Sequence, residues 1–207
     1  AARTLTTSAA LNANKNVVLV DGARTPFARS NQEYDGVWAY DLQREAISGL
    51  LKRNPAVAAK DIGMVSCGTV IMDVSTSNIA REAALAAGIP ENVPCNTVTL
   101  ACISSNVAIA QCTQAIQTGQ CDIAIAGGVE VMSDVPIRYP RATRSWMIKH
   151  ASKAKGLTGP KGILGKLGKA PALGKFFNPE TPAVAEFSTG ETMGHSADRL
   201  CSSFGVT

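Results

Sequence analysis

The chain has 207 residues, 45% hydrophobic and 17% charged, so it can bury a core in one large domain or in one domain with a subdomain. No run of about 20 apolar residues predicts a membrane-spanning helix, and the six cysteines show neither a C-x-x-C pair nor the spacing of a metal site. The net charge is +4, and the cysteine pattern is typical of reduced thiols in an intracellular compartment, not of a secreted disulfide framework.

The N-terminal part of the chain combines a polar leader with a short apolar run. Residues 1–15 are rich in Ala, Thr, Ser and Asn and contain no acidic residue, so they are either a frayed terminus or the tail of a mitochondrial transit sequence. Asn16–Val20 predicts a buried first strand, and Gly22–Pro26 predicts a turn. Arg24 in this turn either steers a substrate phosphate or serves a structural ion pair or a subunit contact.

A helix, a strand and a second helix follow. Asp41 can cap a helix that ends at Asn54, where a proline comes next. The run Ile62–Ile71 predicts the next strand. Ile79–Ala87 predicts an alanine-rich helix that Gly88 is well placed to end.

Residues 96–133 predict a strand, a helix and another strand. The first strand stops at Ala101–Cys102, the helical recurrence continues to Gly119, and Asp122–Ala126 reads as a buried strand. A βαβ unit of this length implies parallel strands. The alternation along the whole chain therefore predicts an α/β fold with a mostly parallel sheet, in which Cys102 lies where a strand is followed by a helix.

The position of Cys102 has a chemical consequence. The unpaired N–H groups at a helix N-terminus favour a thiolate over a thiol. They can also hydrogen-bond the oxyanion that forms when the sulfur attacks a thioester. Cys102 is thus a candidate nucleophile; the alternative is that it is one of six cysteines and fills a gap in the core.

The positive charge is concentrated in one insertion. Residues 135–179 contain ten of the 20 basic residues and no acidic residue, which leaves ten basic against 16 acidic residues elsewhere, a net charge of −6. Within 138–177 basic and apolar residues alternate, so this segment could lie on an anionic membrane surface, contact a partner subunit, attract the phosphates of coenzyme A, or be a solvated loop. Nucleic acid is not expected as a partner, because the rest of the chain is acidic and no recognition motif is present.

Four blocks of the sequence resemble the thiolase family, the enzymes that cleave or form 3-ketoacyl-CoA. The similarity extends from Asn16 onward, and its last block resembles the Met-Gly segment that lies near coenzyme A in the family. Within the family, Ala101–Ser104 and Met132–Arg138 are most similar to the mitochondrial trifunctional enzyme branch. The blocks are Val20–Phe27, Asn96–Asn106, Gly127–Ser133 and Glu191–Arg199.

The resemblance implies a domain organisation. Residues 1–15 would be a disordered or transit-derived terminus, 16–134 a thiolase-like N-terminal half with a mostly parallel sheet and helices on both faces, and 135–207 the basic insertion with part of a loop subdomain. Thiolases pack two similar halves around the active site, and this chain resembles the first. It further implies a mitochondrial location, in the matrix or at the inner membrane, and a partner in the form of a second half or a homologous subunit.

The resemblance also implies roles for individual residues. Cys102 would carry an acyl-cysteine intermediate, Met193 would contact coenzyme A as a substrate, and no metal or permanently bound cofactor is expected. The family takes its base and acid from Gly-His-Pro and Cys-x-Gly segments of the second half, which do not occur here, and neither His150 nor His195 matches the base. The isolated chain is therefore expected to be inactive.

A second hypothesis remains open from the sequence. The chain could be a non-catalytic, thiolase-derived subunit retained for assembly or membrane docking in a larger mitochondrial complex. The ketoacyl synthases share the architecture and a similar cysteine, but the Gly127–Ser133 block favours a thiolase.

Overall fold

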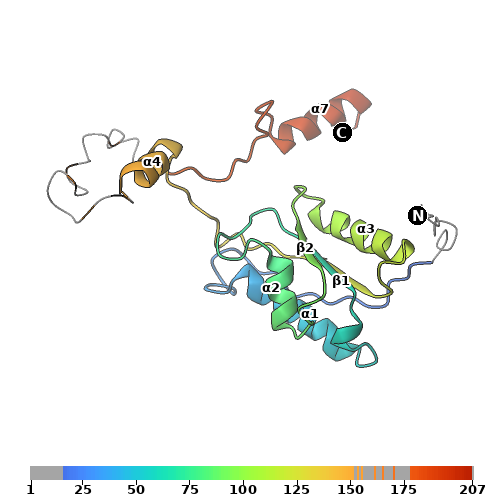
Figure 1. Ribbon diagram of the computed structural model, residues 1–207. Coiled ribbons are helices and arrows are strands. Elements are labelled where there is room, and N and C mark those ends of the chain that lie inside the picture. Colours follow the sequence, from blue (N-terminus) through green and yellow to red (C-terminus); the bar gives the residue numbers. More distant parts are fainter. Residues whose placement is uncertain are drawn as a thin grey trace, which may run out of the picture. The chain divides into compact units, whose positions relative to one another are not determined.

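The computed structural model describes residues 16–151, 153, 155, 161, 165, 170 and 178–206. The chain divides into two compact units, residues 1–135 and residues 136–207. Figure 1 shows the strands in the first unit and the C-terminal helix in the second.

The first unit is an α/β structure in which helices and strands alternate. Its elements were largely anticipated by the sequence pattern, with the strands shorter or shifted by two residues. In chain order they are α1 (Ala39–Arg53), the 3-10 helix η2 (Ala59–Asp61), β1 (Met64–Gly68), α2 (Ile79–Ala86), β2 (Cys95–Val98), α3 (Ser104–Gln117) and β3 (Ala124–Gly128).

Local capping explains where the helices begin and end. The backbone N–H of Arg81 donates to the Asn78 side chain at the start of α2, and Gly88, with φ +88°, follows its end. Asp41 accepts from the Trp38 backbone N–H from within the first turn of α1, so it caps this helix from the third helical position and not from in front of it.

The three strands form one parallel sheet in the order β2-β1-β3. Val65 of β1 lies opposite Cys95 of β2 on one side and opposite Ile125 of β3 on the other. The sheet is parallel throughout the described residues, as the βαβ pattern predicts. Because parallel strands end at the same edge, the segments that follow β1, β2 and β3 start from one edge of the sheet.

Helices cover both faces of this sheet (Figure 1). On one face the Ser66 hydroxyl of β1 donates to the Gln111 side chain of α3 at 3.1 Å, and Gly68, two residues further, faces the start of the same helix. Cys67 points to the opposite face and is buried in the core with Ile47 of α1. The predicted fold class, a mostly parallel sheet between two layers of helices, is confirmed.

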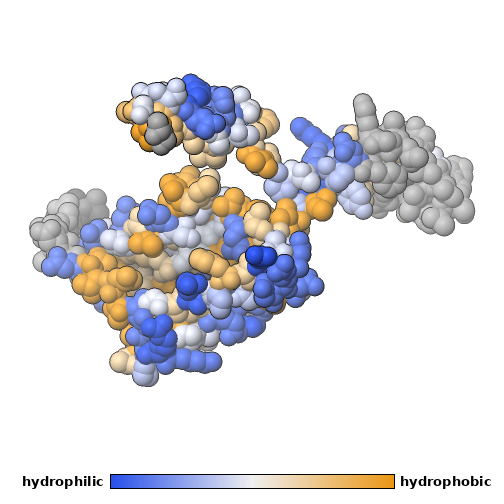
Figure 2. Space-filling view, turned by 180° about the vertical axis from the view of Figure 1, so that it is seen from behind, coloured by the Kyte–Doolittle hydropathy of each residue, from blue (hydrophilic) through white to orange (hydrophobic). Residues whose placement is uncertain are grey.

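The predicted first strand is wrong. Asn16–Val20 is not part of a strand, and the side chains of Val18, Leu19 and Val20 are 74%, 92% and 78% exposed. No backbone hydrogen bond connects this run to the described part of the sheet. Strands need a hydrogen-bonding neighbour, which an apolar run in the sequence does not supply by itself. Figure 2 shows hydrophobic residues, in orange, at the surface of the first unit.

The second unit contains α4 (Arg141–Trp146), the π-helical turn η3 (Met147–Ala151) and α7 (Met193–Phe204). Most of the predicted basic insertion after residue 151 lies outside the described residues. In the part of the chain that the structure describes, none of the helices combines the length and the apolar character needed to cross a bilayer.

One carboxylate connects the two flanks of the insertion. Arg138 and Glu180 form an antiparallel bridge through two backbone hydrogen bonds of 3.0 and 2.8 Å. The Glu180 carboxylate also accepts from the Arg141 backbone N–H and from the Arg144 guanidinium, each at 2.7 Å. These donors, first of all the Arg141 N–H, lower the pKa of Glu180. Glu180, the first acidic residue after the basic run, therefore joins the segments before and after it.

Candidate functional site

The candidate nucleophile Cys102 lies in a tight turn between β2 and α3. The strand ends at Val98 and the helix begins at Ser104, so Cys102 precedes the first helical residue by two positions. Ala101, immediately before it, has φ +45°, a left-handed conformation that side chains other than glycine rarely adopt. Cys102 is exposed, so the alternative that it fills a gap in the core of this unit is excluded.

Two hydroxyl groups hold this turn. The Oγ of Ser104 accepts from the Leu100 backbone N–H at 2.9 Å and donates to the Ala101 carbonyl at 2.7 Å. The hydroxyl of Thr99 donates to the Thr69 carbonyl at 2.8 Å, which connects the start of the turn to the end of β1. The turn is thus fixed both internally and to the neighbouring strand.

Two glycines let the start of α3 lie directly on the sheet. A Cβ atom on Gly68 would lie 2.4 Å from the backbone nitrogen of Ser105 and 2.5 Å from the carbonyl carbon of Ser104. A Cβ atom on Gly128 would lie 2.0 Å from the Ser105 hydroxyl. The absence of side chains at these positions therefore sets how close the helix N-terminus, and with it Cys102, comes to the strand ends.

Glu130 fixes the segment that leaves β1. Its two carboxylate oxygens accept from the backbone N–H groups of Val70 and Ile71, at 2.8 and 3.1 Å. Ser133 in the same block accepts from the backbone N–H of Asn31 at 2.7 Å. The block from Gly127 to Ser133 therefore contacts the segments after β1 and after the N-terminal turn, and its Gly128 lies against Ser105 of the helix that follows Cys102.

The six cysteines differ in their surroundings. Burial raises the pKa of Cys67 to about 12 and that of Cys112 to about 11, so both thiols stay protonated at neutral pH. Burial also raises the pKa of Cys95. Cys102 and Cys201 are exposed, and of these two only Cys102 precedes a helix. Among the described residues, no three His, Cys, Asp or Glu side chains gather as they would around a metal ion.

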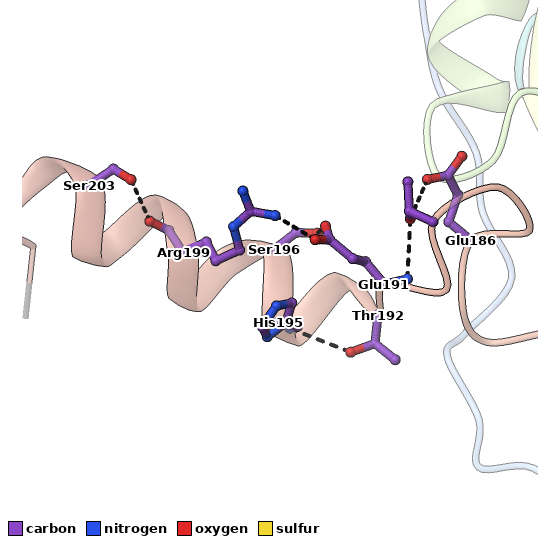
Figure 3. Close-up of polar contacts among 8 residues, drawn as sticks. Glu186, Glu191, Thr192, His195, Ser196, Arg199 and Ser203 are labelled. Carbon is purple, nitrogen blue, oxygen red and sulfur yellow. Dashed lines mark hydrogen bonds and ion pairs between the residues drawn. The ribbon is translucent and has the colours of Figure 1, made fainter.

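Met193 is the first residue of α7, in the second unit. Its side chain is 75% exposed in that unit. Figure 3 shows how this helix begins: the Thr192 hydroxyl accepts from the His195 backbone N–H at 3.5 Å, and Glu191 pairs with Arg199, eight residues further on. His195 is itself exposed on this helix. Cys102 and Met193 belong to different units, and the structure describes each within its own unit.

Arg24 lies beside a cavity of about 400 Å³ in the first unit. The cavity is lined by the N-terminal turn, by α1 and by the segment from Ile125 to Ser133, and its lining does not include Cys102. The Arg24 guanidinium lies 4.8 Å from the centre of the Phe27 ring. The guanidinium also donates to the Thr25 carbonyl at 3.4 Å, and the predicted role in a phosphate, ion-pair or subunit contact stays a prediction.

Three of the four sequence blocks meet around the strand ends. The Cys102 block lies over Gly128, and residues 23–27 of the N-terminal block line one cavity with the Gly127–Ser133 block. Ser104 and Glu130 were not singled out from the sequence as site residues. Their spacing from Cys102 and from the double glycine was visible, but their hydrogen-bond partners depend on the tertiary structure.

Comparisons with known proteins agree with this arrangement. The family profile described as "Thiolase, N-terminal domain" matches residues 17–207. The bovine (Bos taurus) mitochondrial trifunctional enzyme subunit beta is 49% identical over 193 residues, 93% of this chain and 39% of that protein. A probable 3-ketoacyl-CoA thiolase of Caenorhabditis elegans is 50% identical over 192 residues, 93% of this chain and 41% of that protein.

Solved structures show the same fold. The acetyl-CoA acetyltransferase of Bacillus anthracis matches 95% of this chain and 44% of its own, with a TM-score of 0.70 and 24% identity. A thiolase of Ascaris suum, solved in complex with coenzyme A, matches 90% of this chain and 42% of its own, with a TM-score of 0.68 and 24% identity. The chain spans about two fifths of the length of the curated relatives it matches.

Proposed function

The chain belongs to the thiolase family, and on that premise we propose that it is the N-terminal half of a 3-ketoacyl-CoA thiolase whose Cys102 carries the acyl group during fatty acid β-oxidation. The observation that supports this proposal most directly is the exposed sulfur in the turn before α3. The N-terminus of a 14-residue helix stabilises negative charge on the thiolate and on a nearby oxyanion.

The proposed reaction has two covalent steps. In the first, a bond forms between the Cys102 sulfur and the 3-keto carbon, the bond between carbons 2 and 3 breaks, and its electron pair and a proton go to the departing acetyl-CoA. In the second, the thiolate of free coenzyme A attacks the acyl carbon, and the bond to the Cys102 sulfur breaks. Coenzyme A enters and leaves as a substrate, and Met193 is proposed to contact it.

A base must take up the thiol proton and an acid must protonate the leaving group. We assign neither role to His150 or His195, because neither lies in a Gly-His-Pro segment. The proposal places these groups on a second thiolase half, in the same polypeptide or on another chain. The relatives support a complex as well, since the bovine protein is named as a subunit of a trifunctional enzyme.

We also propose a mitochondrial location, which the names of the mammalian relatives support. There the basic insertion, residues 138–177, would contact an anionic membrane surface or a partner subunit through its cations. Attachment at the membrane surface would require no membrane-spanning helix. Nothing in the comparisons favours the alternative of a purely structural subunit.

The test compares two cysteine variants of the native protein, purified with its second thiolase half. Cys102→Ala should abolish 3-ketoacyl-CoA cleavage and the acyl adduct on the Cys102 peptide, whereas Cys201→Ala, which removes the other exposed cysteine, should leave both intact. Native mass spectrometry should show that a second thiolase half, which carries the Gly-His-Pro and Cys-x-Gly segments, accompanies this one. Turnover by Cys102→Ala at the parent rate would refute the role of Cys102, and turnover by the isolated 207-residue chain would refute the divided site.

A further inference from the structure

We propose that Ser104 is a positioning residue for Cys102: its buried hydroxyl holds the left-handed turn at Ala101 that places the sulfur at the N-terminus of α3. This inference rests on the proposed function, in which Cys102 is the nucleophile. It concerns a different residue, Ser104, whose hydroxyl makes two hydrogen bonds that an alanine at this position could not make.

The backbone before Cys102 needs external support. A left-handed conformation brings the Cβ atom of an L-residue close to the following carbonyl oxygen, so Ala101 with φ +45° persists only if its surroundings enforce it. Backbone bonds supply part of this support, since the N–H groups of Ile103 and Ser104 donate to Leu100 and Ala101, each at 3.2 Å.

The Ser104 hydroxyl supplies the rest. It is one of the few groups that can accept and donate at once, and here it accepts from Leu100 N–H at 2.9 Å and donates to the Ala101 carbonyl at 2.7 Å. These two backbone groups flank the peptide plane that leads into the strained residue. A single side chain therefore fixes both ends of the turn.

Burial makes this support hard to replace. Ser104 is 4% exposed, because the start of α3 lies against Gly68. Water has little access to substitute for a lost hydroxyl, so an alanine at this position leaves the Leu100 N–H without its acceptor. Relaxation of the turn then moves the sulfur away from the helix N-terminus, and the thiolate loses the stabilisation that this position gives.

The neighbouring Ser105 offers a matched control. It is exposed and differs from Ser104 by one position in the same first helical turn. Its side chain faces Gly128 of β3, whereas the Ser104 hydroxyl bonds the backbone around Ala101. Ser104→Thr is the conservative variant, because threonine retains a hydroxyl that can accept and donate.

The experiment measures cysteine alkylation by iodoacetamide in the purified protein, with each peptide quantified by mass spectrometry. Cys201, exposed on α7 in the other unit, is the internal reference, and buried Cys67 reports whether the fold is intact. Ser104→Ala should lower the ratio of Cys102 to Cys201 labelling by about threefold to tenfold, as expected for the loss of one or two hydrogen bonds. Ser104→Thr and Ser105→Ala should stay near the parent ratio.

The outcomes are separable. An unchanged or higher ratio in Ser104→Ala, with Cys67 still protected, would overturn the proposal. Labelling of Cys67 in Ser104→Ala would overturn it too, because Ser104 would then serve the fold as a whole and not the placement of Cys102. The assay requires no turnover, so it distinguishes a failure of this proposal from a failure of the proposed function, which the Cys102→Ala activity measurement decides.

Discussion

The contact between Gly68 and α3 predicts a large effect of one methyl group. In Gly68→Ala the new Cβ atom would lie 2.4 Å from the Ser105 nitrogen and 2.5 Å from the Ser104 carbonyl carbon, whereas ordinary contact begins near 3.4 Å. Both neighbours are backbone atoms, which no side-chain rotation can remove. The start of α3 must therefore move by about 1 Å away from the strand.

The expected cost follows from this displacement. Overpacking of a filled core destabilises by about 1–3 kcal/mol, occasionally more, and Gly68 belongs at the upper end because it is buried against backbone on α3. The matched control is Gly49→Ala inside α1, where no atom lies within 4 Å of the added Cβ. There the better helix propensity of alanine should stabilise the protein by about 0.5–1 kcal/mol.

Urea unfolding followed by circular dichroism measures both variants. For an m-value of roughly 1–3 kcal/mol/M, the Gly68→Ala midpoint should fall by about 1 M, while the Gly49→Ala midpoint should rise slightly. The displaced turn should also lower Cys102 labelling relative to Cys201. A Gly68→Ala free energy of unfolding within about 0.5 kcal/mol of the parent, the range of harmless surface changes, would refute the argument that the glycine sets the approach of α3.

Two predictions concern pH. Burial raises the pKa of Cys67 from 9.0 to about 12, and it also raises the pKa of Cys112. These buried thiols therefore stabilise the fold below pH 9, and their contribution is lost as the pH rises toward about 12. The urea midpoint should fall between these two pH values, and it should fall less steeply in Cys67→Ala. The Arg141 N–H and the Arg144 guanidinium lower the pKa of Glu180 below 4.5. The Glu180 contacts are therefore present above pH 4.5 and are lost as the pH falls through the lowered pKa. The NMR signal of the Arg141 amide should change with this loss, and the change should be absent in Glu180→Gln. An Arg141 amide signal that does not change on acidification of the parent protein would contradict the prediction for Glu180.

Much of the first unit could be predicted because its signals are local. The Asn78 cap, Gly88 and the apolar recurrences depend on neighbours within a few residues in the chain, which is why α2 and α3 lie where the pattern indicated. The placement of Cys102 before a helix followed from the same signals. The family relationship could also be recognised from the sequence, since its blocks are contiguous.

What the sequence alone determined about this protein is therefore the alternation of helices and strands from α1 to β3, its family and the chemical identity of Cys102. Tertiary structure decided that Asn16–Val20 forms no strand in the described unit, that Gly68 lets α3 approach, and that the Ser104 hydroxyl closes the turn at Ala101. The physical reason is distance along the chain: propensity and capping act between near neighbours, whereas strand pairing, close approach and burial depend on which remote segments the fold brings into contact.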